Sequence, residues 1–220
     1  KNNLGENRDP RLDYTIYYNG STFRGSEYRL SPDYEAGKKE RLDYSSEASR
    51  TGFMWRKYYT EEPINDLTSY SAVTPIIRYA EVLLSYLESM IESGQQVDQG
   101  LLDATINKVR GRQDVQMPSI TETNTSNLRE IVRHERRVEL AYEGIRLWDI
   151  FRWKIADDVL VGEIWGAPYP DAAKLGNSKK QDPTGNGRWY VGRRDFRSPQ
   201  DYTWPVPLSE QNINPNLRDN

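Results

Sequence analysis

The sequence predicts a mainly α-helical protein in which two helical hairpins lie between long irregular segments that carry a few short strands. Apolar residues recur at helical spacing only between residues 71 and 158. Turn-forming residues punctuate residues 1–70 and 159–220. Of the 220 residues, 36% are hydrophobic, which is enough for one core. We therefore expect residues 1–220 to form a single region with a loop-rich start, a helical middle and an irregular C-terminal segment.

Residues 1–70 show no helical period, and they contain turn signals such as Asn19-Gly20 and Ser31-Pro32. Polar and apolar residues alternate over residues 12–17, which predicts one short strand. Residues 53–59 are rich in aromatic side chains, and they predict a second strand or an extended segment. This part of the chain is thus expected to consist of loops with short strands.

The first predicted hairpin joins helices over residues 73–93 and 98–111. In the first helix the apolar residues step by three and four, beginning at Ile76 and Ile77. Pro75 suits the first turn, where no N–H donor is needed, and Gly94 suits the C-terminus. Because only a short link follows Gly94, the two helices are expected to be antiparallel neighbours.

The second predicted hairpin is divided by Gly144, which interrupts the helical period. Asn127 is the expected N-cap of its first helix, because asparagine side chains accept hydrogen bonds from exposed N–H groups. The second helix is expected over residues 145–157. Its three large aromatic residues are assigned to the core: Trp148, Phe151 and Trp153.

Composition excludes several classes of function. The net charge is −3 and no basic block alternates with aromatic residues, which disfavours a nucleic-acid partner. The chain has no cysteine, so disulfides, thiolate nucleophiles and zinc–thiolate sites are excluded. The longest apolar runs are far shorter than the roughly 18–20 residues that span a bilayer. We therefore expect neither a transmembrane helix nor a signal peptide within this sequence.

No group of residues predicts catalysis, a metal site or a cofactor. The single histidine, His134, lies in a densely charged helix and is expected to pair with Glu130 as a structural residue. Asp182 begins a segment similar to the start of a calcium loop. Arg193 stands where that loop requires a bidentate glutamate, so a turn is expected instead. Counting the 33 acidic residues does not identify a glycosidase pair either.

Three carboxylates, Glu135, Glu139 and Glu143, share one face of the third predicted helix at four-residue spacing. Carboxylates at this spacing beside arginines are typical of ion pairs that join one helix to another. Four arginines are close enough in the sequence to be the expected partners: Arg136, Arg137, Arg146 and Arg152. We interpret the three carboxylates as structural.

Aromatic side chains are the unusual feature of the composition, with 6 Trp and 15 Tyr. A pyranose ring exposes an apolar C–H face of roughly 40 Å², and its contact with Trp or Tyr contributes on the order of 1–2 kcal/mol. Many of the rings lie on predicted loops, near Asn, Asp and Arg residues that hydrogen-bond hydroxyl groups. A carbohydrate-binding surface is one interpretation of these rings, and core packing is the other.

Residues 128–153, LREIVRHERRVELAYEGIRLWDIFRW, resemble the hallmark of the SusD/RagB family of outer-membrane nutrient-binding lipoproteins. Further pieces agree in order: DPRL at 9–12, TGFMWRKY at 51–58, IRYAEVLL at 77–84, NKVRGR at 107–112, WPVPLSE at 204–210 and NPN at 214–216. The resemblance covers nearly the whole chain, but it corresponds to only the C-terminal portion of a family member.

The resemblance implies a fold of tetratricopeptide-like helical hairpins and a cell-surface location in Bacteroidetes. It implies non-catalytic binding of an oligosaccharide or polysaccharide, and delivery to a SusC-like TonB-dependent outer-membrane transporter. A lipid anchor N-terminal to this chain would be the only link to the membrane. The most recognisable family residues are expected to be architectural: Arg136, Arg137, Glu139, Glu143, Gly144, Arg146, Asp149 and Trp153.

Ligand contacts in the family come from variable loops, so candidates follow only from aromatic residues on predicted loops. We nominate Trp55, Tyr28, Tyr34 and Trp165 as ligand-binding candidates. Two alternatives stay open. One is a RagB-like member that captures peptides or proteins. The other is a helical interaction module that docks on the transporter and has no ligand site in this part of the protein.

Overall fold

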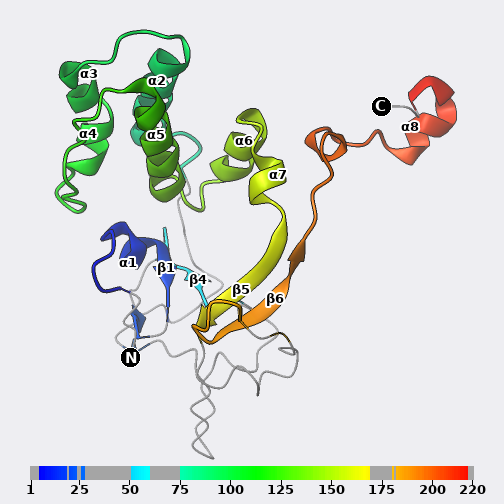
Figure 1. The fold of residues 1–220 in the computed structure, drawn as a ribbon, viewed down its shortest axis with the longest axis horizontal. Coiled ribbons are helices and arrows are strands. Elements are labelled where there is room, and N and C mark those ends of the chain that lie inside the picture. The colour runs from blue at the N-terminus through cyan, green and yellow to red at the C-terminus, as the bar shows by residue number, and fades with distance from the viewer. Residues whose placement is uncertain are drawn as a thin grey trace, which may run out of the picture.

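The computed structural model of the chain describes residues 5–18, 20–23, 26–27, 51–59, 75–168, 180 and 182–217. A group of helices lies on one side, and an extended β-hairpin and the C-terminal segment lead away from it (Figure 1). The structure is mostly helical with a few short strands, which confirms the predicted fold class. None of the described helices is both long and apolar enough to cross a membrane.

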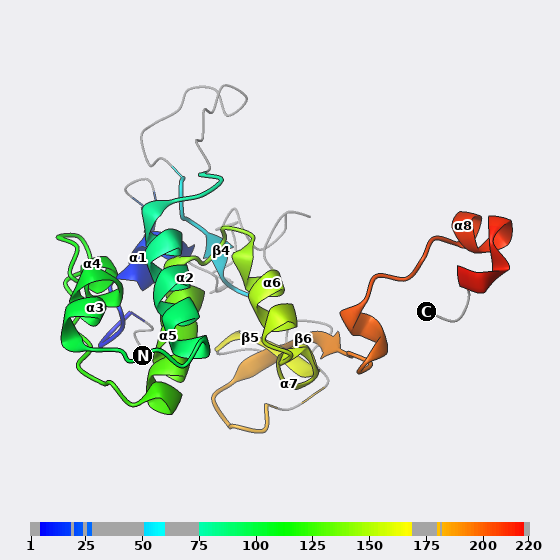
Figure 2. The same ribbon diagram turned by 90° about the horizontal axis from the view of Figure 1, so that it is seen from above.

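The apolar core lies between α2 (Tyr79–Glu92), α3 (Gln99–Ala104), α4 (Ile106–Arg110) and α5 (Thr125–Glu139). α2 packs along α5, and α3 and α4 pack against α2 (Figure 2). Burying one large aliphatic side chain stabilises a fold by about 1.5–3 kcal/mol. The side chains that hold these helices together are Leu84, Leu87, Ile91, Leu102, Ile106, Val109, Leu128 and Val132.

α2 begins later than predicted. Pro75 lies before the helix, and Ile76 and Ile77 are 93% and 70% exposed instead of buried. Arg78 is the reason, because its backbone is extended (φ −134°, ψ 160°) and its guanidinium donates hydrogen bonds to carboxylates at the far end of α5. The end of the helix agrees with the prediction, since Gly94 follows it with φ +72°.

The helix predicted over residues 98–111 is divided into α3 and α4. Thr105 lies between them with φ −121° and ψ −97°, and its hydroxyl donates a 2.6 Å hydrogen bond to the carbonyl of Leu101. Asp98 caps α3 by accepting a hydrogen bond from the Leu101 N–H at 2.8 Å. Both short helices pack against α2, so the first predicted hairpin is present.

α5 begins slightly before the predicted position. Asn124 is its N-cap and accepts hydrogen bonds from the N–H groups of residues 126 and 127, so Asn127 lies inside the first turn. Asn124 takes the N-cap position because it stands directly before the first helical residue, Thr125. Asn127 lies within the helix, where its own N–H group is bound by the Asn124 side chain. Gly144 separates α5 from the next helix with φ +78°, a conformation that glycine adopts without strain.

Two helices, α6 (Ile145–Arg152) and α7 (Ala156–Val159), replace the single helix predicted over residues 145–157. Lys154 lies between them with φ +55°, which interrupts the helix. Trp148 is 60% exposed, so its assignment to the core was wrong. Asp149 and Ile150 occupy the buried face of α6, because Asp149 is bound by an arginine of α5.

The strand predicted over residues 12–17 is mostly a helix, α1 (Arg11–Thr15). Asp9 starts this helix, because its carboxylate accepts a 2.9 Å hydrogen bond from the Arg11 N–H and its carbonyl accepts one from the Leu12 N–H. The sequence carried a helix-start signal here, an acidic residue followed by proline, that the alternating pattern obscured.

Short antiparallel pairs follow α1. β1 (Ile16–Tyr17) pairs with β4 (Met54–Trp55), with Ile16 opposite Trp55, so only part of the segment predicted over residues 53–59 is a strand. β2 (Thr22–Phe23) pairs with β3 (Ser26–Glu27). Backbone hydrogen bonds from Arg56 and Lys57 to the carbonyl of Thr15 extend the contact between α1 and the segment after β4.

The segment after residue 160, predicted to be irregular, contains an antiparallel hairpin of β5 (Gly162–Pro168) and β6 (Arg188–Arg194). Before β6, the carboxylate of Asp182 accepts hydrogen bonds from the N–H groups of Thr184 and Arg188. The guanidinium of Arg188 lies 2.9 Å from the same carboxylate. These contacts confirm the turn predicted at Asp182.

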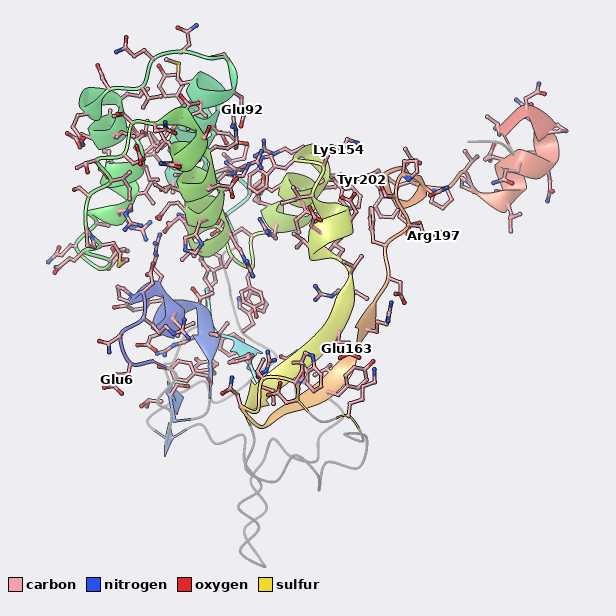
Figure 3. All side chains as sticks on the ribbon, viewed as in Figure 1. Glu6, Glu92, Lys154, Glu163, Arg197 and Tyr202 are labelled. Atoms are coloured by element: carbon pink, nitrogen blue, oxygen red, sulfur yellow. The ribbon has the colours of Figure 1, made fainter. Side chains whose placement is uncertain are left out.

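The C-terminal segment contains η3 (Gln200–Tyr202), α8 (Leu208–Ile213) and η4 (Pro215–Leu217). Tyr202 anchors its start, because its ring contacts Phe151 and Phe196 and its hydroxyl accepts a 2.9 Å hydrogen bond from the Ala156 N–H. Figure 3 shows Tyr202 beside Lys154, whose ammonium lies 4.5 Å from the ring centre. α8 lies apart from the helical group in both ribbon views (Figures 1 and 2).

Candidate functional site

Three carboxylates lie at the C-terminal end of α5 and directly after it: Glu135, Glu139 and Glu143. The four-residue spacing places Glu135 and Glu139 on one side of α5, whereas Glu143, predicted on the same helix face, lies in the turn after the helix ends. All three side chains are buried. A buried carboxylate is costly unless it is paired with cations, so the surroundings of these groups determine whether the fold tolerates them.

Glu139 is the centre of the arrangement, because three arginines from distant parts of the chain meet it. Its carboxylate lies 2.9 Å from Arg11, 2.7 Å from Arg78 and 2.5 Å from Arg112. Its carbonyl also accepts a 2.6 Å hydrogen bond from Lys57. α1, the residue before α2 and the turn after α4 are therefore joined to α5 through a single side chain.

The neighbouring carboxylates share the same cations. Glu135 lies 2.5 Å from Arg11 and 2.7 Å from Arg110, and Glu143 lies 2.5 Å from Lys57 and 2.7 Å from Arg78. The prediction that these carboxylates form ion pairs between elements is confirmed. We call the following eight residues the ionic cluster: Arg11, Lys57, Arg78, Arg110, Arg112, Glu135, Glu139 and Glu143.

The arginines predicted as partners lie elsewhere, so that part of the prediction was wrong. Arg136 binds Asp149 at 3.0 Å, and Arg152 binds Glu88 at 2.6 Å and Asp149 at 2.8 Å. Arg137 is exposed. The reason is geometric: neighbours of a helical glutamate in sequence point to other sides of the helix, and here they reach α2 and α6.

Trp153 completes this second group of polar contacts. Its indole N–H donates a 2.5 Å hydrogen bond to Glu88. The guanidinium groups of Arg133, Arg146 and Arg152 lie 4.8, 5.7 and 4.9 Å from its ring centre, within the range of cation–π attraction. These contacts tie the end of α6 to α2 and α5, as expected of an architectural residue.

A cleft of about 480 Å³ opens beside the ionic cluster, a volume within the range of small-molecule sites. It lies between α1, the segment after β4, the end of α5 and the turn after α4. Its walls combine tyrosines, cationic groups and few acids: Tyr14, Tyr58, Tyr59, Arg11, Arg56, Lys57, Arg78, Arg112, Asp114 and Glu139, with Thr15 and Val138.

The cluster changes the pKa values of its members. Burial alone would raise the pKa of Glu139, but hydrogen bonds from Arg11 and Arg78 outweigh it and lower that pKa to about 2. Burial lowers the pKa of Lys57, and the hydrogen bond to Glu143 offsets only part of that effect. Glu139 is therefore a permanent anion at neutral pH, which keeps the surrounding guanidinium groups in place.

Two exposed aromatic rings are neighbours in sequence of a cleft residue, Arg56, and of a residue of the ionic cluster, Glu143. Trp55 stacks on Tyr142, with ring centres 6.0 Å apart and planes inclined by 18°. Trp55 is 44% exposed and Tyr142 is 50% exposed. Trp55 directly precedes two residues of the cleft wall, and Tyr142 directly precedes Glu143. Each ring thus keeps part of its apolar surface in solvent.

Of the four predicted ligand-binding residues, only Trp55 and Trp165 lie in the described part of the structure. Trp55 lies on β4 and Trp165 lies on β5, and neither lines the cleft. Trp165 is half-buried with its ring edge-on to Tyr190 at 5.6 Å. Tyr28 and Tyr34 lie outside the described residues.

The cleft itself was not predicted, although four of the family strings held its five cations, with Arg56 and Lys57 both in the string at residues 51–58. Arg11 lies in the string at residues 9–12, and Arg78 and Arg112 lie in two others. An arginine in each of several strings shared by a family is a signal that they meet a common acidic group. Tyr14 was missed because it was placed in a strand.

The remaining predictions concern metals and the single histidine. His134 is exposed on α5, and Glu130 lies 3.9 Å from Arg133 instead of forming the expected pair with His134. Within the described ranges, no group of three or more His, Cys, Asp and Glu side chains is arranged to hold a metal ion.

Comparison with known proteins places the chain in a family. The model of the SusD family matches residues 2–220. A SusD-like carbohydrate-binding protein from Bacteroides fragilis is 66% identical over 98% of this chain, with a TM-score of 0.88. A second SusD-like protein from Bacteroides fragilis is 26% identical over 94% of the chain, with a TM-score of 0.65.

The chain spans 42% of the length of the first of these structures and 37% of the second. Among curated proteins, none matches the chain significantly. The family match extends over almost the whole sequence and includes every string that carried the predicted resemblance. The chain therefore belongs to the SusD family.

Proposed function

We propose that this protein binds oligosaccharides or polysaccharides at the bacterial cell surface without catalysis and delivers them to a SusC-like TonB-dependent outer-membrane transporter. The observation that carries this proposal is the 66% identity, over 98% of the chain, to a SusD-like carbohydrate-binding protein. In this proposal a lipid anchor outside the present sequence is the link to the membrane.

The Trp55–Tyr142 stack supports carbohydrate as the ligand class. Sugar rings bind with an apolar C–H face against an aromatic ring, and both rings of this pair are exposed and nearly parallel. The adjacent cleft supplies tyrosine hydroxyls and cationic N–H donors that hydrogen-bond sugar hydroxyl groups. We propose the stack and the cleft as one binding surface, with Trp55 as its leading aromatic contact.

We propose three further ligand-binding residues, which have less support than Trp55: Trp165, Tyr28 and Tyr34. Trp165 retains a partly exposed ring on β5 with the Arg188 guanidinium 5.7 Å from its centre, an arrangement that accommodates a sugar at the hairpin. Tyr28 and Tyr34 rest on the sequence argument alone.

Non-catalytic binding agrees with the state of the acids at the cleft. Glycoside hydrolysis needs a carboxylic acid that holds a proton near neutral pH, which requires a raised pKa. The pKa of Glu139 is lowered to about 2, and its oxygens are engaged by three arginines. Glu139 is thus suited to hold the wall of the cleft and unsuited to donate a proton.

Native affinity electrophoresis through gels that contain plant, host or microbial polysaccharides tests the proposal. We expect one glycan class to retard the protein, and Trp55→Ala to weaken that retardation by about tenfold, since one ring contact is worth on the order of 1–2 kcal/mol. Trp204→Ala is the matched control, because Trp204 is also exposed but lies in the C-terminal segment.

The alternatives make different predictions in the same experiment. A peptide-capturing protein would ignore every glycan and show tryptophan fluorescence quenching with a peptide pool. A helical docking module is favoured by the row of exposed apolar residues on and before α2, which includes Ile76, Tyr79 and Tyr86. Such a module would form a complex with the transporter that survives substitution of Trp55 and Trp165. Hydrolysis of any glycan by the pure protein would contradict non-catalytic binding.

A further inference from the structure

The charges of the ionic cluster are arranged in two layers. The carboxylates lie behind, with side chains only 1% (Glu135), 2% (Glu139) and 5% (Glu143) exposed. Three of the five cations are more exposed and line the cleft, Lys57 at 17%, Arg78 at 21% and Arg112 at 36%, whereas Arg11 and Arg110 are only 6% and 12% exposed. A ligand that enters the cleft therefore meets N–H donors before it meets carboxylate oxygens.

The composition of the cleft wall agrees with this layering. Five of the lining residues are cationic and two are acidic. Glu139 is one of the two, and it belongs to the buried layer. Asp114 is the only acid among the described lining residues whose carboxylate is largely in solvent. The wall thus carries an excess of positive charge on a chain whose overall net charge is −3.

Arg112 is the cation best placed to bind a ligand. Both terminal nitrogens face the carboxylate of Glu139, at 2.5 Å and 3.4 Å, and its Nε lies 3.4 Å from the exposed Asp114. A guanidinium has five N–H donors, so Glu139 holds one side of the planar fork and the side formed by Nε and the other N–H of Nη2 faces the exposed Asp114, whose place a ligand oxyanion would take. A planar fork of this kind binds a carboxylate or a sulfate with two parallel hydrogen bonds.

Aromatic rings beside these cations match the rest of a sugar. Tyr14 and Tyr59 line the cleft and are 57% and 41% exposed. One sugar can use both groups, because its apolar face packs on an aromatic ring while its oxyanion binds a guanidinium. The hydroxyl groups of a neutral sugar also accept hydrogen bonds from these N–H donors, but only an oxyanion gains from their fixed positive charge.

From this juxtaposition we infer that the cleft between α1 and the end of α5 recognises an acidic sugar, with the carboxylate of a uronic or sialic acid, or a sulfate ester, bound by Arg112 and the neighbouring cations. The inference rests on the proposed function, because it specifies which glycans the same surface selects. A sugar carboxylate and a sulfate ester are both oxyanions, so the same guanidinium donors would bind either group.

Matched polysaccharide pairs test the inference. The purified protein is run by affinity electrophoresis through pectic, alginate, glycosaminoglycan and sialylated glycans, each beside its neutralised form made by carboxyl reduction, desulfation or desialylation. We expect retardation by at least one acidic glycan and at least tenfold weaker retardation by its neutralised form. Carboxyl-reduced and desulfated samples of one glycosaminoglycan distinguish carboxylate from sulfate. Added salt should weaken the binding.

Variants locate the effect in the cleft. Arg112→Gln should weaken binding of the acidic glycan by about tenfold, and Arg112→Lys should weaken it less, because the charge is retained without the fork. Asp114→Asn should strengthen binding by removing an exposed acid from the wall. Arg129→Gln is the matched control, because it makes the same change of charge at the other end of α5, where Arg129 pairs with Glu92.

The outcomes separate the inference from the proposed function. Equal retardation by acidic and neutralised glycans, or binding of a neutral glycan alone, overturns the inference and leaves glycan binding intact. Loss of binding in Arg129→Gln equal to that in Arg112→Gln also overturns it, since the charge effect would then be general. If the protein binds no glycan at all, both the inference and the proposed function are wrong. If Arg112→Gln does not fold, unchanged affinity in Asp114→Asn and Arg112→Lys still counts against the inference.

Discussion

Along α5, one buried stripe changes character from the first half of the helix to the second. Leu128 and Val132 face the core, and Glu135 and Glu139 continue the same stripe at the next three- and four-residue steps. All four are buried to a similar degree, but the first two contact aliphatic side chains and the last two contact arginines. The helix thus joins an apolar core to a charged wall that faces the cleft.

Burial therefore has opposite energetic effects in the two halves of α5. At the apolar half, removing area from water stabilises the fold in a non-directional way, so similar side chains can substitute for one another. At the charged half, desolvation is unfavourable and is offset only by cations at fixed positions. Such an arrangement fixes the positions of its side chains, and the cleft lies at this end of the helix.

The largest effect is expected from Glu139→Gln. The substitution keeps the shape of the side chain but leaves Arg11, Arg78 and Arg112 without their shared anion. Breaking a buried ion pair from one side costs about 3–5 kcal/mol, because the remaining charges stay buried. Urea unfolding measures the loss of stability, and a change below about 1 kcal/mol would show that solvent reaches the cluster.

Leu128→Ala is expected to have the next largest effect, a loss of about 2–4 kcal/mol of stability. Leu128 is fully buried in the core, and its truncation leaves a cavity that the neighbouring helices fill only in part. The variant should leave glycan affinity unchanged at a temperature where it is folded, whereas Glu139→Gln should reduce it. Equal effects of both variants on affinity would remove the distinction between the two halves of α5.

The pH dependence of unfolding measures the stability that Glu139 contributes to the charged half of α5. The folded-state pKa of Glu139 is about 2, below its ordinary value of 4.5, so its contribution is fully present above about pH 4.5 and is lost as the pH falls toward 2. Protonation of Glu139 should remove on the order of 3 kcal/mol of stability over that range. Urea midpoints of the wild type and of Leu128→Ala should fall in parallel, and Glu139→Gln should show a shallower decline.

The apolar half of this comparison could be predicted from the sequence, and the charged half only in part. Helical spacing identifies the face of α5 that is buried, which is why Glu135 and Glu139 were found together; Glu143 joins them from the turn after the helix. Spacing carries no information about the elements opposite that face. Arg11 is 128 residues from Glu139 in the chain and Arg78 is 61 residues away, so only the fold brings them together.

The errors at α2 and α6 have the same origin. Ile76 continues the apolar period, but Arg78 is held extended by carboxylates of α5, and the helix begins after it. Trp148 is the largest apolar residue of α6, yet Asp149 faces inward because Arg136 binds it. In both places a buried ion pair overrides the hydrophobic pattern. The candidate aromatic residues were predicted from residue type alone, which does not define their position relative to a cleft.

The smallest effect is expected from Glu92→Gln, which removes an ion pair on the exposed side of α5. Arg129 lies 2.7 Å from Glu92, as close as the pairs of the ionic cluster, but both side chains are in contact with solvent. An exposed pair contributes about 0.2–1 kcal/mol, and salt screens it. Urea unfolding should therefore barely distinguish this variant from wild type, and not at all at high salt. The N–O distances in the two places are similar, so only burial distinguishes them. If Glu92→Gln lost as much stability as Glu139→Gln, the short distances and not the burial would account for the stability of the ionic cluster. The difference between the apolar and the charged half of α5 would then not depend on burial.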